Sequence, residues 1–246
     1  MRDDLGVEVR LVRPVQRVVS LVPSLTEALA ATRPDALVGA TDWCTRPADL
    51  GVARVRGTKN PDRRRILELA PELVVANQEE NRELDVRRLR EAGVPVWVTV
   101  VRSVPEAVAS MTRLFEEALG WGTPAWLEDV RGAWEGPVPP VRLRVAVPIW
   151  RDPWMVLGRD TFAGDLLRGR GLLNVFAGAE DRYPTVTLED LEAAAPDLVL
   201  LPDEPYVFTA QDGPEAFRRT PTRLVSGRLL TWYGPSLLEA VTVPLS

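Results

Sequence analysis

Large aromatic side chains gather in the parts of this sequence that have the composition of loops. They are Trp43, Trp150, Trp154, Tyr183, Tyr206, Phe208, Trp232 and Tyr233. A protein in water gains little by leaving such rings exposed, so they either fill the core beneath the loops or line a binding site. Eight such rings favour the second interpretation, an aromatic pocket for a large, flat and partly apolar ligand.

Polar residues lie between these rings and could orient such a ligand. Arg151 is the strongest candidate, because it stands next to Trp150 and close to Trp154, directly after an apolar run of strand length. Polar groups in an apolar pocket discriminate between ligands, because the wrong ligand leaves them unpaired. The polar residues that we expect to contact the ligand are Ser24, Asp42, Lys59, Glu79, Arg151 and Glu204.

Composition limits the chemistry that this chain can perform. Its 246 residues include no histidine and one cysteine, Cys44. Ser-His-Asp and Cys-His catalysis and a Cys/His zinc site are therefore excluded, and we predict no metal site and no catalytic residue. A net charge of -5, without a basic stripe, argues against nucleic acid as a partner.

The N-terminal region carries charges throughout, and no window approaches the roughly 18 apolar residues of a membrane span. One cysteine cannot form an internal disulfide, which suits a reducing compartment. From these features we expect a cytoplasmic protein that does not insert into a membrane.

Apolar runs of strand length alternate with helical patterns in both halves of the chain, which predicts an α/β fold with parallel sheets. The expected strands are 17–22, 37–43, 71–77, 94–100, 144–150, 196–202 and 222–227. Helix starts are predicted at the capping box of Ser24 and Glu27, at Asn60 followed by Pro61, and at Thr187.

One pattern occurs twice: "ILELAPELVVANQEE" (66–80) returns as "LEDLEAAAPDLVLLPDEP" (188–205). Pro71 and Pro196 are 125 positions apart, and Arg17 and Arg144 are 127 apart. A single doubly wound sheet could reuse such units. The matched order instead favours two Rossmann-like lobes, 1–101 and 137–246, joined by a helical connector over 102–136. Ligands of open α/β sheets bind at the carboxyl ends of the strands, so we expect the ligand in a cleft between the lobes.

Five segments resemble the class III, long-helix substrate-binding proteins of ABC importers, above all the vitamin B12-binding branch of the helical backbone metal receptors. They are "RVVSLVPSLTEAL", "VGATDWCTRP", "TKNPD", "PWMVLGRDTFAGDLL" and "YPTVTLEDLEAAAPDLVLL", in family order along the whole chain. The resemblance implies two lobes, a stiff connecting helix, and a corrinoid, haem or ferric siderophore as ligand. Without histidine, only Cys44, methionine or tyrosine could coordinate a metal. This makes haem a weaker candidate ligand and leaves cobalamin possible. No cofactor is required.

The resemblance also implies that a surface glutamate on each lobe docks onto the membrane permease. The matching positions are Glu189 and Arg64, so one of the two acidic groups is replaced by a basic one. This replacement makes an ABC permease a doubtful partner and favours a cytoplasmic binding protein for a cobalamin-like ligand. Two alternatives remain: an enzyme that uses Asp, Glu or Tyr, for instance Glu79 and Asp203, as acid and base, and the solute-binding component of an ABC importer.

Overall fold

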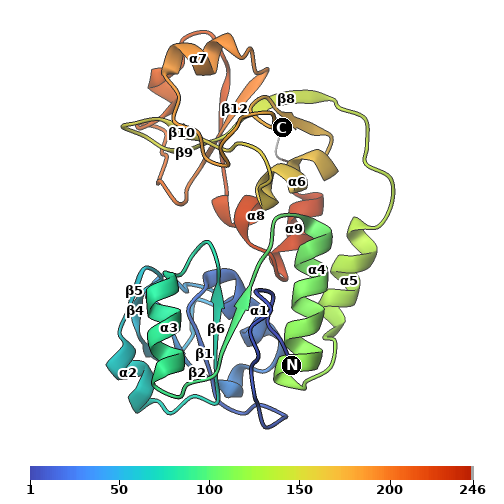
Figure 1. Ribbon diagram of the computed structural model, residues 1–246. Coiled ribbons are helices and arrows are strands. Elements are labelled where there is room, and N and C mark those ends of the chain that lie inside the picture. Colours follow the sequence, from blue (N-terminus) through green and yellow to red (C-terminus); the bar gives the residue numbers. More distant parts are fainter. Residues whose placement is uncertain (245–246) are drawn as a thin grey trace. The chain divides into compact units, whose positions relative to one another are not determined.

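A computed structural model of the chain describes residues 1–244 and divides them into two compact units. The first unit comprises Met1–Val101, Pro105–Arg131 and Tyr233–Pro235, and the second comprises Arg102–Val104, Gly132–Trp232 and the residues from Ser236 onwards. Helices flank the sheet in each unit (Figure 1). The segment 102–136, which we expected to be a separate connector, contributes residues to both units.

The first unit is built on a parallel sheet of five strands in the order β3-β2-β1-β6-β7. These strands are β1 (Val18–Ser20), β2 (Leu37–Ala40), β3 (Ala53–Arg54), β6 (Leu73–Asn77) and β7 (Val96–Thr99). The short strands β4 (Arg56–Gly57) and β5 (Asn60–Pro61) form an antiparallel ribbon. Three helices lie wholly in the first unit: α1 (Pro23–Thr32), α2 (Arg63–Glu68) and α3 (Glu83–Glu91), with a 3-10 turn at Pro34–Ala36. Most residues of α4 (Val104–Arg113) and α5 (Ala125–Trp134), and the π-helix between them (Leu114–Leu119), belong to it as well.

The second unit is built on a parallel sheet of four strands in the order β11-β8-β12-β13. These strands are β8 (Leu143–Ala146), β11 (Leu172–Asn174), β12 (Leu198–Pro202) and β13 (Thr222–Val225), and an antiparallel ribbon joins β9 (Pro148–Trp150) to β10 (Met155–Val156). Its helices are α6 (Phe162–Gly169), α7 (Leu188–Ala193), α8 (Gly227–Thr231) and α9 (Ser236–Thr242), with a 3-10 turn at Pro214–Ala216. The predicted α/β fold of two units with separate parallel sheets is confirmed.

The repeated sequence pattern forms the same connection between a helix and the next strand in each unit; we call this connection the joint. In the first unit the Arg17 guanidinium donates hydrogen bonds to the carbonyl oxygens of Leu69 (2.6 Å) and Ala70 (3.3 Å), just after α2. In the second unit Arg144 bonds in the same way to Ala194 (3.0 Å) and Ala195 (3.3 Å), just after α7. Each arginine thus satisfies carbonyl groups that a helix end leaves without partners.

The same joint forces the chain through a left-handed turn. Ala70 and Ala195 both have positive φ, 44° and 48°, and the proline that follows each of them cannot continue the helix. After the proline, an acidic residue binds the amino end of the neighbouring strand. Glu72 accepts the N–H of Gln16 (2.6 Å), and Asp197 accepts the N–H of Arg144 (2.8 Å). The "Ala-Pro-acid" pattern therefore occurs twice because each unit contains this joint.

Two of the three predicted helix starts are wrong. Helix α1 begins at Pro23, and no side chain caps it, so Ser24 lies inside the helix. Asn60 and Pro61 pair with β4, and the side chain of Asp62 accepts the N–H of Arg65 to cap α2. The third prediction is confirmed: Thr187 caps α7 in a reciprocal box with Asp190.

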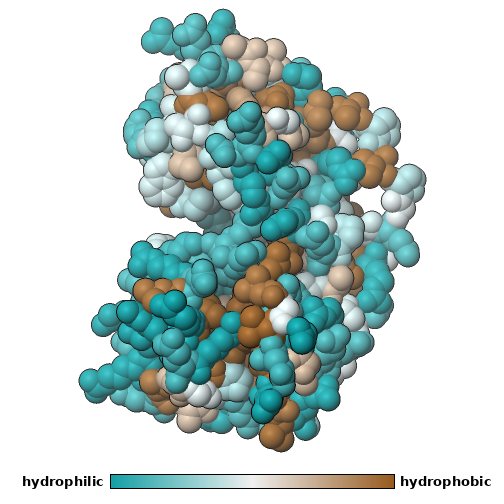
Figure 2. Space-filling view, in the orientation of Figure 1, coloured by the Kyte–Doolittle hydropathy of each residue, from teal (hydrophilic) through white to brown (hydrophobic). Residues whose placement is uncertain are grey.

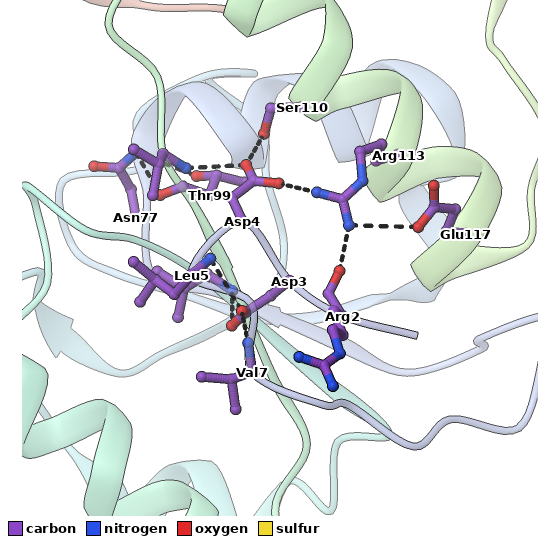
Figure 3. A network of polar contacts seen from close by, with 12 residues as sticks. Arg2, Asp3, Asp4, Leu5, Val7, Asn77, Thr99, Ser110, Arg113 and Glu117 are labelled. Carbon is purple, nitrogen blue, oxygen red and sulfur yellow. Dashed lines mark hydrogen bonds and ion pairs between the residues drawn. The ribbon is translucent and has the colours of Figure 1, made fainter.

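The N-terminal residues lie along the outer edge of β7 (Figure 3). The N–H of Asp4 donates to the carbonyl of Val98 (3.1 Å), and the carboxylates of Asp3 and Asp4 accept the N–H groups of Val98 (3.3 Å) and Val100 (3.0 Å). Asp3 is buried and also pairs with Arg90 at 2.6 Å. We call Asp3 and Asp4 at this strand the carboxylate edge. It supplies hydrogen-bond acceptors to N–H groups that would otherwise be unpaired at the edge of the sheet.

Asp4 also joins this edge to helix α4. Its carboxylate accepts hydrogen bonds from Ser110 and from Arg113, the latter at 2.6 Å, and Arg113 reaches the carbonyl of Arg2 as well (Figure 3). The N-terminal charges therefore belong to the folded first unit and hold it together.

Candidate functional site

The carboxyl edge of the first sheet carries a polar cluster at the ends of β6 and β7. Asn77 is buried, and its side-chain amide donates to the carbonyl of Thr99 at 3.2 Å, while its Oδ1 accepts the N–H of Glu79 at 2.8 Å. The Lys59 ammonium donates to the Glu79 carbonyl. The structure thus brings the predicted residues Lys59 and Glu79 together on one turn, fixed by Asn77.

Two further predicted residues, Ser24 and Tyr233, meet below this edge. The phenol of Tyr233 lies next to Ser24 and Thr99, and all three residues are buried. Burial raises the pKa of Tyr233 well above its ordinary value, and the charge of Glu80 adds to this. Tyr233 is therefore a neutral phenol that anchors the segment Tyr233–Pro235 in the first unit, and it is not positioned as a phenolate ligand.

The loop after β2 places one ring in water. Trp43 is 67% exposed, and its neighbour Asp42 is exposed as well. In contrast, Cys44 is fully buried, and its Sγ atom accepts a hydrogen bond from Thr26 at 3.0 Å. Desolvation raises the pKa of the Cys44 thiol, so this thiol does not supply a thiolate to a metal.

The second unit holds four of the eight predicted rings in one aromatic cluster at the ends of β9 and β12. Trp154 stacks on Phe208 with centroids 5.9 Å apart, Tyr206 lies 4.6 Å from Phe208, and Trp150 meets Tyr206 edge to face at 5.5 Å. Phe217 packs against Trp154 at 5.5 Å. Phe208 and Phe217 are buried in the core, whereas Trp150 is 45% exposed at the margin of the cluster. The structure thus separates packing rings from one ring that is open to a ligand.

Arg151 links the segment of Trp150 and Trp154 to residues 212–215. Its guanidinium makes ion pairs with Asp212 and Glu215, and it lies 5.4 Å above the ring of Trp154. Asp212 in turn accepts the hydroxyl proton of Tyr206 at 2.6 Å. These bonds raise the pKa of Arg151, through Glu215 first, and raise the pKa of Tyr206 through Asp212. With Asp152 at 3.8 Å, Arg151 therefore has three carboxylate partners within the second unit.

Glu204 and Trp232 meet beside α8, which Trp232 directly follows. The Glu204 carboxyl has hydrogen-bonding contacts with Trp232 and Thr231, and burial raises its pKa. Its Oε1 atom is buried without a partner among residues 1–244, while the neighbouring Asp203 accepts the N–H of Gly227 at 2.7 Å. Because Trp232 is buried, this pair sits beneath the surface, and Asp203 is bound to the first turn of α8.

Tyr183 is the exposed phenol of the second unit, and the guanidinium of Arg182 lies 5.7 Å from its ring centre. No group of three or more Cys, Asp or Glu side chains within residues 1–244 is arranged to hold a metal ion. A groove of about 440 Å³ occurs elsewhere, in the first unit, lined by 8–10, Arg90 and 93–96. None of the predicted ligand residues lines it.

The two predicted docking residues occupy matching places on matching helices. Arg64 in α2 and Glu189 in α7 each stand two positions after the capping residue, Asp62 and Thr187. Both are exposed, Arg64 to 91% of its side chain, and Arg64 pairs only locally with Glu68 at 3.0 Å. The structure therefore supports the alignment of these two positions, although it does not test docking.

Sequence reasoning missed Asp212, Glu215 and Phe217. These residues orient Arg151, Tyr206 and Trp154, but they are about 60 positions away from Arg151 along the chain. The only available signal was the density of acidic and turn residues in "TAQDGPEAF".

No family model matches the chain. The vitamin B12-binding protein of Vibrio cholerae is 24% identical to it over 196 residues, which cover 76% of this chain and 70% of the relative. The vitamin B12-binding protein of Pectobacterium carotovorum is 24% identical over 200 residues, covering 77% and 72%.

Solved structures agree with these relatives. The periplasmic vitamin B12-binding protein BtuF of Vibrio cholerae superposes with a TM-score of 0.73 at 20% identity, covering 93% of this chain and 94% of its own. The periplasmic haem-binding protein BhuT, solved with two haems, gives a TM-score of 0.77 at 27% identity, covering 92% and 95%. The resemblance of this chain to the class III binding proteins is confirmed, as a distant similarity in sequence and a shared fold.

These similar structures overturn the expected location. The similar solved structures from this family, BtuF and BhuT among them, are described as periplasmic, so the cytoplasmic location that we inferred from the sequence is wrong. The inference failed because the N-terminal charges have a structural role: Asp3 and Asp4 close β7, and their presence says nothing about export. No helix within residues 1–244 is long and apolar enough to cross a membrane, and hydrophilic residues cover most of the visible face of both units (Figure 2).

Proposed function

We propose that this class III protein is the solute-binding component of an ABC importer and that it binds a tetrapyrrole, with a corrinoid of the cobalamin type preferred. The observation that carries the proposal is the exposure of two rings, Trp43 after the parallel strand β2 and Trp150 at the end of β9, in the antiparallel ribbon that follows β8. The fold is shared with proteins that bind vitamin B12 and haem. Flat macrocycles gain from aromatic contact, and such rings in water otherwise lower solubility.

The preference for a corrinoid rests on the side chains that could coordinate a metal. The chain has no histidine, the Cys44 thiol is buried with a raised pKa, and Tyr233 is a buried neutral phenol. The hydroxyl of Tyr206 donates a hydrogen bond to Asp212, which raises the pKa of this phenol. A corrinoid can be held by enclosure and polar contacts to its periphery, without a bond from the protein to cobalt, so it suits this set of residues.

Haem is the second candidate, and Tyr183 is the residue that favours it. This phenol is exposed, and a tyrosine oxygen is a known haem ligand. Substitution of Tyr183 by phenylalanine separates the two ligands. It would remove the charge-transfer features of a phenolate-bound ferric haem and would leave corrinoid binding unchanged.

The test is a spectroscopic titration of the purified protein with cyanocobalamin and, separately, with hemin. We expect saturable quenching of tryptophan fluorescence by cyanocobalamin at a defined stoichiometry. Each of Trp43→Ala and Trp150→Ala should weaken binding by about 10-fold, because loss of an aromatic contact costs roughly 0.5–1.5 kcal/mol beyond its buried area. Val12→Ala, at an exposed position, is the matched surface control. Absence of saturable binding of either ligand would refute the proposal.

A further inference from the structure

Strand β13 forms an outer edge of the second sheet, and its outward backbone groups have no partner. It pairs with β12 alone, with Thr222 opposite Val199 and Leu224 opposite Leu201. The carbonyls of Pro221 and Val225 accept the N–H groups of Val199 (2.9 Å) and Asp203 (3.2 Å), so backbone groups at alternate positions point toward β12. The main-chain groups of Thr222 and Leu224 therefore point away from it, and nothing within residues 1–244 bonds to them.

The first unit shows how this protein closes an edge strand of the same length. Along β7, a turn over residues 3–6 presents Asp3 and Asp4, whose carboxylates accept the N–H groups of Val98 and Val100. The same two carboxylates pair with the flanking Arg90 and Arg113, each at 2.6 Å. Carboxylates held by neighbouring arginines thus complete this edge.

The open edge of β13 has the matching charges and an apolar contact. Arg218 and Arg223 are exposed on and just before the strand, and neither has an ion-pair partner within residues 1–244. The side chain of Leu224 is 44% exposed on the strand itself. Outward N–H groups, two exposed arginines and one exposed apolar side chain therefore occur within residues 218–224.

We propose that the open edge of β13 binds an extended acidic segment of a partner protein by strand addition. Main-chain hydrogen bonds to Thr222 and Leu224 would supply affinity, and carboxylates paired with Arg218 and Arg223 would supply specificity. A second copy of this chain is a poorer occupant, because edge-to-edge pairing of two β13 strands brings the same arginines to one seam.

The probe is a capped, fluorescein-labelled octapeptide of alternating threonine and aspartate, followed by fluorescence anisotropy with the full chain. The control peptide carries lysine in place of aspartate. Leu224→Pro removes one outward N–H and no bond to β12, which is the position where an edge strand tolerates proline. Arg223→Glu reverses one charge, and Arg10→Glu, at an exposed position outside the strand, is its matched control.

We expect saturable binding of the acidic peptide only, weakened by about 3- to 10-fold in Leu224→Pro, the range for one hydrogen bond, and at least as much in Arg223→Glu. Arg10→Glu should bind as the unaltered protein does. Arg223→Glu also serves if the proline variant fails to fold, which circular dichroism would reveal. Equal binding of the lysine peptide, unchanged binding in both variants, or concentration-dependent self-association that Leu224→Pro abolishes would overturn the proposal.

Discussion

In the first unit the outer strand β7 is lined by Asp3 and Asp4, whereas in the second unit the outer strand β13 has no such neighbour. The joints inside the units are nevertheless the same, since Arg17 and Arg144 bond to equivalent carbonyls after equivalent helices. The joints that define the fold are therefore the same in both units, while the edge strands differ. The loops that carry exposed rings differ between the units as well: Trp43 is a single exposed ring in the first unit, whereas Trp150 contacts the aromatic cluster of the second.

The largest effect is expected at the carboxylate edge of the first unit. Asp3→Ala should lower the free energy of unfolding by about 3 kcal/mol, because it leaves Arg90 and several buried or half-buried N–H groups without their acceptor. Urea denaturation monitored by circular dichroism measures it. Asp35→Ala, at an exposed aspartate of the same unit, should change stability by less than about 0.5 kcal/mol. Equal effects of the two substitutions would show that the edge does not stabilise the unit.

The shared joint should respond equally in both units. We expect Arg17→Met and Arg144→Met each to cost about 1 kcal/mol, because methionine keeps much of the aliphatic stem and loses two exposed hydrogen bonds to helix carbonyls. Chemical denaturation of each variant measures the loss. A difference of more than about 1 kcal/mol between them would mean that the two joints are not equivalent in energy.

The repeated pattern is the part of the fold that sequence predicted best, because helix, turn and strand are local there and the spacing is visible. Thr187 with Asp190 is equally local, and its cap was predicted correctly. The start of α2 was not, because Asn60 and Pro61 pair with β4 through tertiary contacts. Arg151 was recognised as important, but its partners Asp212 and Glu215 lie far along the chain, where no spacing rule reaches. Asp3 and Asp4 gave no signal for the same reason.

A smaller and opposite effect is expected at the left-handed turn of each joint. Ala70→Gly and Ala195→Gly should each raise the free energy of unfolding by about 0.5 kcal/mol, because glycine adopts positive φ without strain and offsets part of that gain by its greater freedom when unfolded. Ala92→Gly is the control, since Ala92 follows α3 with φ of -80°. It should be neutral or destabilising in the same thermal melts, and stabilisation at all three positions would contradict the explanation.

The smallest change in stability is expected for Glu204→Gln in the second unit, and it should depend on pH. Burial raises the pKa of Glu204, so its protonated form is favoured by folding, and that stability is lost as pH rises through the folded-state pKa. Glu204→Gln should therefore be more stable than the unaltered protein at pH 7, and the difference should shrink as pH falls toward 4. Denaturation series between pH 4 and 8 measure the trend. A difference that stays constant across this range would show that ionisation of Glu204 has no part in it.

Tyr233 and the two residues after it complete the first unit from the far end of the chain. During synthesis, the buried place of that phenol beside Ser24 and Thr99 must wait until nearly all other residues have left the ribosome. The nascent first unit thus stays unfinished while the second is being made, and a fragment that stops at residue 136 would carry an uncovered polar hollow where Tyr233 belongs.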